Sequence, residues 1–65
     1  MRTIKRNIII PEWANWIAQN QIGDWYAYEF VPVIGEYGWD SPDGKDARLF
    51  EGPVYEKWQN TLARV

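Results

Sequence analysis

The stretch that decides the fold runs from residue 16 to residue 30 and reads Trp16-Ile-Ala-Gln-Asn20-Gln-Ile-Gly23-Asp-Trp-Tyr-Ala-Tyr-Glu-Phe30. Two aromatic-rich runs flank a polar turn. Large flat side chains suit a pleated surface, and Asn and Gly supply the positive φ that tight turns often need. The stretch therefore predicts a β-hairpin with strands at about 15–19 and 25–31.

Side chains of the second strand are expected to alternate between two faces of the sheet. One face would carry Tyr26, Tyr28 and Phe30, and the other Trp25, Ala27, Glu29 and Val31. Because both sets contain aromatic rings, we expect one side of the sheet to be covered and the other to be partly exposed.

The segment before the hairpin predicts a further strand. Residues 2–10 are rich in isoleucine, and Pro11 stops any ladder after them. Lys5 and Arg6 would lie near a sheet edge, where charge discourages pairing between chains. Residues 11–17 fit either one helical turn or a turn that leads into the strand at 15–19, and we favour the turn.

The segment after the hairpin alternates turns with short strands. Residues 33–44 are rich in Gly and Pro, with a short strand expected around Tyr37 and Trp39 and another at 47–50. Residues 53–65 predict a helix, whose apolar stripe is Val54, Trp58, Leu62 and Val65. The predicted fold class is therefore α+β: a small antiparallel sheet of three to four strands with a short C-terminal helix.

Length and composition limit how this fold can be stabilised. With 65 residues the chain is a single small domain, 1–65, and it has no cysteine and no histidine. Disulfides and the common zinc sites are therefore ruled out. Five Trp, four Tyr and two Phe supply the apolar bulk instead, because each buried ring removes a large area from water.

The charge is small in total but uneven along the chain. The net charge is −2, and no Lys or Arg occurs between Asn7 and Gly44, a stretch that holds six acidic residues. These acids either keep an aromatic surface soluble or form a negative face toward a basic partner. No apolar run approaches the roughly 20 residues of a membrane span, and none resembles a signal peptide, so we expect a cytoplasmic protein.

Catalytic and metal-binding patterns are weak. Without Cys or His the usual nucleophile–base pairs are missing, and so short a chain leaves little room for a closed cleft, so we do not expect an enzyme. Asp40, Asp43 and Asp46 are regularly spaced, but the loop lacks the glycine that an EF-hand needs at its sixth position. We therefore expect no metal site, and the lack of a Gly-rich phosphate loop predicts no cofactor.

Two resemblances can be read from the aromatic positions. Trp16, Gly23, Tyr26, Tyr28 and the run Trp39-Asp40-Ser41-Pro42 are similar to the frame of a WW domain, which implies an aromatic groove for Pro-rich peptides. The loop lengths differ from that frame, and 20 or more residues follow it.

A longer pattern covers most of residues 10–62. It comprises Ile10-Pro11-Glu12-Trp13, Trp16-Ile17-Ala18-Gln19-Asn20, Gly23-Asp24-Trp25-Tyr26-Ala27-Tyr28-Glu29, Pro32, Trp39, Gly44 and Trp58-Gln59-Asn60-Thr61-Leu62. This pattern resembles a group of small bacteriophage-encoded proteins, although Gln21-Ile22 replaces the more acidic turn typical of them. The resemblance implies a phage origin and the cytoplasm of a host bacterial cell, and it implies no reaction.

The leading hypothesis is a phage-encoded accessory protein that binds a host protein with a basic surface and inhibits or redirects it. Trp and Tyr dominate binding hot spots, and the acids around them would steer a basic partner. The expected contact residues are Trp25, Glu29, Tyr37, Trp39 and Asp40.

Two other functions stay open. One is a nucleic-acid-associated regulator that uses Arg2, Lys5 and Arg6. We do not favour it, because the aromatic stretch lacks the positive groove that this mode of binding needs. The other is a structural component of the phage.

Overall fold

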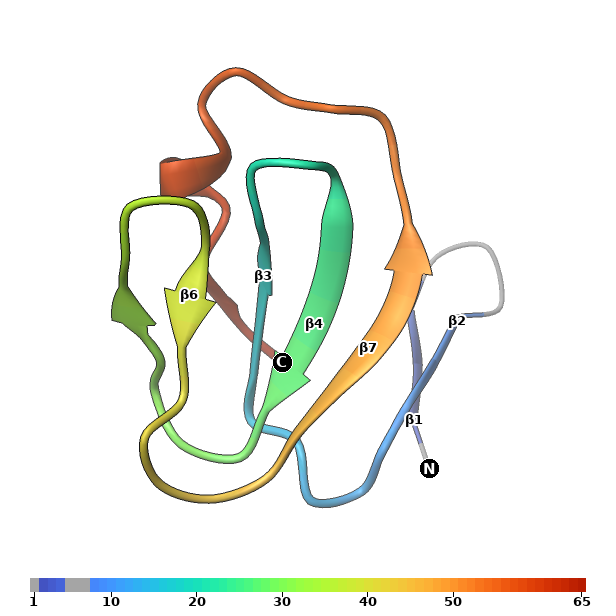
Figure 1. Ribbon diagram of the computed structural model, residues 1–65. Coiled ribbons are helices and arrows are strands. Elements are labelled where there is room, and N and C mark those ends of the chain that lie inside the picture. The colour runs from blue at the N-terminus through green and yellow to red at the C-terminus, as the bar shows by residue number, and fades with distance from the viewer. Residues whose placement is uncertain (1, 5–7) are drawn as a thin grey trace.

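The computed structural model describes residues 2–4 and 8–65, with only the backbone described for 2–4 and 8. Over these residues the chain forms short strands and one 3-10 turn (Figure 1). The elements are β1 Arg2–Ile4, β2 Ile8–Ile10, β3 Trp16–Gln19, β4 Asp24–Tyr28, β5 Val33–Ile34, β6 Trp39–Asp40, β7 Asp46–Glu51, η2 Trp58–Asn60 and β8 Ala63–Arg64. No helix in this part of the chain is long and apolar enough to cross a membrane.

The predicted hairpin is confirmed, and it forms the centre of a four-stranded antiparallel sheet with the order β7-β4-β3-β8. Strands β3 and β4 pair with Ala18 opposite Tyr26. Gly23 closes the turn between them with a φ of 98°, a conformation that glycine adopts without steric cost. Strands β3 and β4 each have a neighbour on both sides, so the hairpin forms the centre of the sheet.

Both faces of this sheet receive a small hairpin. The antiparallel pair β1–β2 brings Ile10 against Ala14 and Ala27 in the buried core, where Trp13 and Leu49 also pack. The pair β5–β6 lies on the side of the sheet that carries Tyr26 and Tyr28. Figure 1 shows the two small hairpins on either side of the central strands.

A β-bulge in β7 shapes the core face. Trp25 pairs with Phe50, but Tyr26 pairs with Arg48, so Leu49 is the extra residue. The bulge lets two successive residues serve one face: Leu49 packs against the core, and Phe50 stacks on Trp25 at a centroid distance of 6.0 Å.

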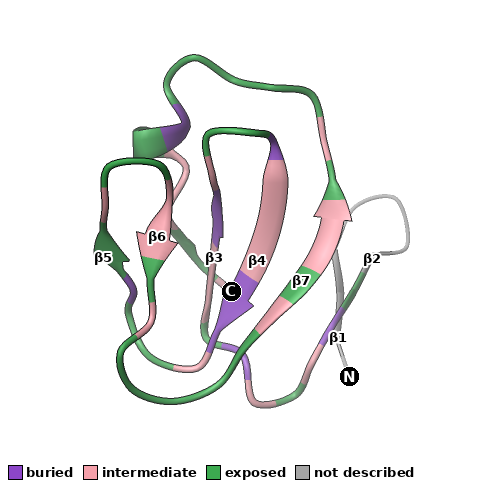
Figure 2. Cartoon of the chain, viewed as in Figure 1, coloured by how far each residue is buried: buried purple, intermediate pink, exposed green. Residues whose placement is uncertain are grey.

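The predicted C-terminal helix is wrong. Residues 52–55 form no regular element, Trp58–Asn60 make a single 3-10 turn, and β8 pairs with the edge of β3. Val54 is 71% exposed, so the apolar stripe is not buried as one face. Figure 2 shows that this connection is largely exposed, with Trp58 as its buried residue. The fold is therefore sheet-rich rather than α+β.

The single strand predicted over 2–10 is also wrong, because β1 and β2 are separate strands that pair antiparallel, with Ile4 opposite Ile8. Lys5 and Arg6, expected near a sheet edge, lie outside the described residues. The turn favoured for residues 11–17 is confirmed: the Ala14 N–H donates to the Pro11 carbonyl at 3.0 Å, and β3 begins at Trp16.

The predicted short strands after the hairpin are present. Trp39–Asp40 form β6, and the strand predicted at 47–50 is β7, one residue longer at each end. The sequence pattern did not predict β5, whose two residues Val33 and Ile34 are both exposed.

Candidate protein-binding site

A cavity of about 250 Å³ lies between the central sheet and the β5–β6 hairpin. Its lining residues come from four parts of the chain: the β3–β4 turn, β4, the β5–β6 hairpin and the start of β7. They are Asn20, Tyr26, Tyr28, Gly38, Trp39 and Asp46.

Two tyrosines of β4 form one wall of this cavity. Tyr26 and Tyr28 are two residues apart on a strand, so their side chains point to the same face. Their rings stack at a centroid distance of 6.3 Å and an interplanar angle of 26°. Tyr28 is only 3% exposed, so its side chain forms the inner part of the wall.

Trp39 contributes the aromatic ring on the hairpin side, and two contacts hold it. Its Nε1–H donates to the Gln19 carbonyl at 3.0 Å, and its ring meets the buried Trp58 edge-on at 6.5 Å and 85°. The neighbouring Tyr37 carbonyl accepts the Gln21 N–H at 3.2 Å. The hairpin is therefore tied through Trp39 to the end of β3 and through Tyr37 to the β3–β4 turn.

Negative charge gathers at the cavity. Asp46 lines it and is the register partner of Tyr28 across β4 and β7. Burial raises the pKa of the Tyr28 hydroxyl to about 12, and the Asp46 carboxylate, Tyr26 and Asp40 add to the rise. The hydroxyl therefore stays neutral at physiological pH, while the carboxylates beside it carry the charge.

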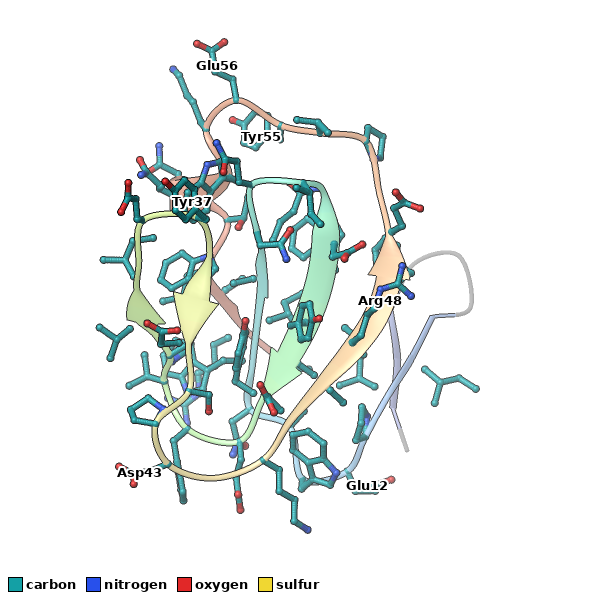
Figure 3. The ribbon with its side chains drawn as sticks, in the orientation of Figure 1. Glu12, Tyr37, Asp43, Arg48, Tyr55 and Glu56 are labelled. Carbon is teal, nitrogen blue, oxygen red and sulfur yellow. The ribbon has the colours of Figure 1, made fainter. Side chains whose placement is uncertain are left out.

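Among the residues whose side chains the structure describes, none that lines the cavity is basic. The nearest candidate in register is Arg48, which pairs with Tyr26 across the two strands. Its guanidinium donates to the Asp24 carboxylate at 3.2 Å, and Figure 3 shows the Arg48 side chain lying along β7. The negative potential of Asp46 and Asp40 is therefore left without a basic partner among the lining residues.

The five residues predicted as contacts do not form one surface. Tyr37, Trp39 and Asp40 lie together on the β5–β6 hairpin, where Tyr37 is 68% exposed at the turn. Trp25 points to the opposite face of β4 and stacks on Phe50. Glu29 follows β4, and its carboxylate accepts the Lys45 N–H at 3.0 Å.

Sequence reasoning missed most of the cavity. Tyr26 and Tyr28 were assigned correctly to one face of β4, but the contact surface was predicted on the other face together with the turns that follow, from which Trp39 lines the cavity. Asn20, Gly38 and Asp46 were not predicted as site residues at all. The Tyr-x-Tyr spacing was the available signal, whereas nothing local to the sequence indicates that β6 packs over these rings.

The spacing of the acidic residues between positions 40 and 46 can be compared with their placement in the fold. Among the residues that the structure describes, no three acidic side chains lie close enough to hold an ion together. Asp40, Asp43 and Asp46 are spread along the chain, from the end of β6 through the following loop to the start of β7.

Comparisons with protein-family models, with curated proteins and with solved structures give no match for this chain. The function is therefore argued from the cavity and its surroundings.

Proposed function

We propose that this chain is a small binding protein that recognises a basic surface on a partner protein. The observation that carries the proposal is the cavity beside β4, which has aromatic walls and a carboxylate in its lining, with no basic residue among the described residues that line it. Aromatic side chains in preformed concave sites are typical anchors of protein interfaces.

The rim of the cavity supports the same proposal. Tyr37 offers a large exposed ring at the hairpin turn, and Asp40 is an exposed acid at the end of β6, next in sequence to the lining residue Trp39. A tyrosine buries much area at the cost of few rotors, and acids at a rim raise the rate at which a basic partner docks. The sequence also lacks the Cys and His of common catalytic sites, which leaves binding as the better use of this surface.

The resemblance to small phage-encoded proteins extends the proposal to a biological setting. In that setting the partner is a protein of the host bacterial cell, and binding inhibits or redirects it. The part of this proposal that concerns the molecule itself, a basic partner at the β6 side, can be tested without knowing the phage.

Affinity capture from a bacterial lysate tests the proposal. We expect the unchanged protein to retain a host protein that the Trp39→Ala/Asp40→Lys double variant loses. Because Trp39 packs on Trp58, the single variant Asp40→Lys serves as a second probe with less risk to folding. Asp43→Lys makes the same charge change in the loop after β6, where neither neighbour in sequence lines the cavity, and should retain the partner.

Circular dichroism must first show that each variant is folded. The proposed surface is not the binding surface if the Asp40→Lys variant retains every protein that the unchanged chain captures. The same holds if Asp43→Lys and Asp40→Lys give identical results.

A further inference from the structure

We propose that the cavity between β4 and β6 receives the cationic end of one basic side chain, the ammonium of a lysine or the guanidinium of an arginine. This inference rests on the proposed function and specifies how the partner is recognised. It is argued from the size of the cavity, its walls and its charge.

The size of the cavity favours a single side chain. Pockets for drug-sized ligands and cofactors are roughly 300–1,000 Å³, and this cavity is smaller, at about 250 Å³. A space of this volume suits one aliphatic arm with a compact cationic head. A dinucleotide or a folded loop would not fit.

The walls favour a cation. Three of the six lining residues are aromatic: Tyr26, Tyr28 and Trp39. The faces of Trp and Tyr rings carry negative potential and attract Lys and Arg within about 6 Å of the ring centroid. The protein already uses this contact internally, since Lys45 lies 6.0 Å from the ring of Trp13 and Arg64 5.7 Å from that of Trp16.

The charge at the cavity favours a cation for a second, independent reason. The Asp46 carboxylate is part of the lining, and Asp40 is close enough to act on the Tyr28 hydroxyl. An aromatic site with a carboxylate neutralises a cation and disfavours an anion or a neutral apolar group. Arg48 does not fill this role from within the chain, because Asp24 holds its guanidinium at 3.2 Å.

Titration of the protein with capped amino acids tests this inference directly. The probes are N-acetyl-lysine methylamide and N-acetyl-arginine methylamide, with N-acetyl-norleucine methylamide as the uncharged control. The readout is the NMR signal of the Trp39 indole N–H, which the Gln19 carbonyl holds in place. We expect saturable shifts with at least one of the cationic probes and none with norleucine at the same concentration.

Two variants locate the binding. Asp46→Asn removes the charge at the cavity without changing side-chain size and should weaken binding of the cationic probe about three- to fivefold. Tyr26→Leu removes one aromatic wall and should weaken it about two- to fivefold. Asp43→Asn removes the same charge outside the lining and should leave the affinity unchanged.

The outcomes separate this inference from the proposed function. Equal shifts of the Trp39 indole signal with the norleucine probe would overturn a cation site. An identical loss of affinity for the cationic probe in Asp43→Asn and Asp46→Asn would also overturn it. No shift with either cationic probe would also overturn it. If the lysate experiment nevertheless retains an Asp40-dependent partner, the binding function stands and only the cavity assignment is lost.

Discussion

At the scale of single residues, Tyr28 links the cavity to the stability of the fold. Its hydroxyl is buried beside Asp46, and its pKa is raised from 10.0 to about 12. Folding therefore favours the protonated phenol. The stability that this adds is fully present below pH 10, where the unfolded chain is also protonated, and it is lost as the pH rises through 12.

We expect the free energy of unfolding to fall by at most roughly 2–3 kcal/mol between pH 10 and 12 because of this residue. Urea denaturation at several pH values measures the fall. Tyr28→Phe keeps the ring and removes the ionisable group, so the difference between the two pH profiles isolates Tyr28 from other groups that titrate there. Parallel profiles for the two proteins would show that Tyr28 ionises equally in both states.

Gly23 is a second residue with a structural role, because the β3–β4 turn depends on its backbone conformation. Its φ is 98°, and a Cβ at this position would lie 2.5 Å from the Gly52 carbonyl oxygen. We expect Gly23→Ala to lower the free energy of unfolding by at least about 2 kcal/mol, because it adds left-handed backbone strain to a backbone clash. Urea denaturation followed by tryptophan fluorescence measures this loss.

Gly38→Ala is the matched control for Gly23→Ala. Gly38 has no positive φ, and its added Cβ would meet only the Asn20 Cβ, at 3.2 Å. We expect a clearly smaller loss there. Equal losses in the two variants would mean that the β3–β4 turn does not depend on glycine.

At the scale of elements, the hairpin was predictable because its signals are local. Alternating aromatic residues select a strand wherever they occur, and Gly23 marks the reversal between the two runs. The same reasoning located β6 and β7. It missed the division of residues 2–10 into β1 and β2, since an isoleucine-rich run gives no sign of where a chain reverses.

The C-terminal segment was predicted wrongly because its burial depends on distant residues. Trp58 is buried against Trp39 of β6, not as part of a stripe with Val54 and Leu62. The segment then supplies β8, which satisfies the edge of β3 at Trp16 and Ile17. A helical spacing of apolar residues does not reveal that a sheet edge needs a partner.

At Gln19, where β8 does not pair with β3, side chains form hydrogen bonds with the edge of β3. The Gln19 N–H donates to the Thr61 hydroxyl at 2.8 Å, and the Gln19 carbonyl accepts the Trp39 indole N–H at 3.0 Å. The Thr61 hydroxyl also donates to the Trp58 carbonyl at 2.6 Å. These bonds attach both η2 and the β6 wall of the cavity to one residue of β3.

We therefore expect Thr61→Val to lower the free energy of unfolding by about 1–3 kcal/mol, because it leaves the partly buried Gln19 N–H without its acceptor. Thr61→Ser keeps the hydroxyl and should lose much less. Thermal denaturation of both variants makes the comparison. A valine variant as stable as the unchanged protein would show that the hydroxyl does not stabilise the fold, and any loss in the serine variant measures the methyl contact, which valine keeps.

At the scale of the whole molecule, the cavity joins segments that are distant in sequence. Its walls come from β4, β6 and the first residue of β7, and they meet only because β5–β6 folds over one face of the central sheet. The predicted contacts Trp39 and Asp40 belong to this hairpin. Trp25 lies on the other face, because adjacent residues of a strand point in opposite directions.

The elements that build the cavity differ in how firmly they are held. Strand β4 is paired on both sides, while β5–β6 is a two-residue pair with both side chains of β5 exposed. Short, exposed elements open locally at low free-energy cost. In native-state hydrogen exchange we expect the amides of β5–β6, including the Gly35 N–H bonded to the Gly38 carbonyl, to exchange far faster than those of β4.

A cation bound in the cavity should slow hydrogen exchange in β5–β6. Opening of β5–β6 removes the Trp39 wall, so a ligand that needs the wall opposes the opening. At a capped lysine concentration of about ten times its Kd, exchange in β5–β6 should slow roughly tenfold. Amides of β1–β2 that exchange by local opening should keep their rates, because that hairpin packs on the other face of the sheet. Unchanged exchange in β5–β6 under saturating ligand would mean that the cation binds without Trp39.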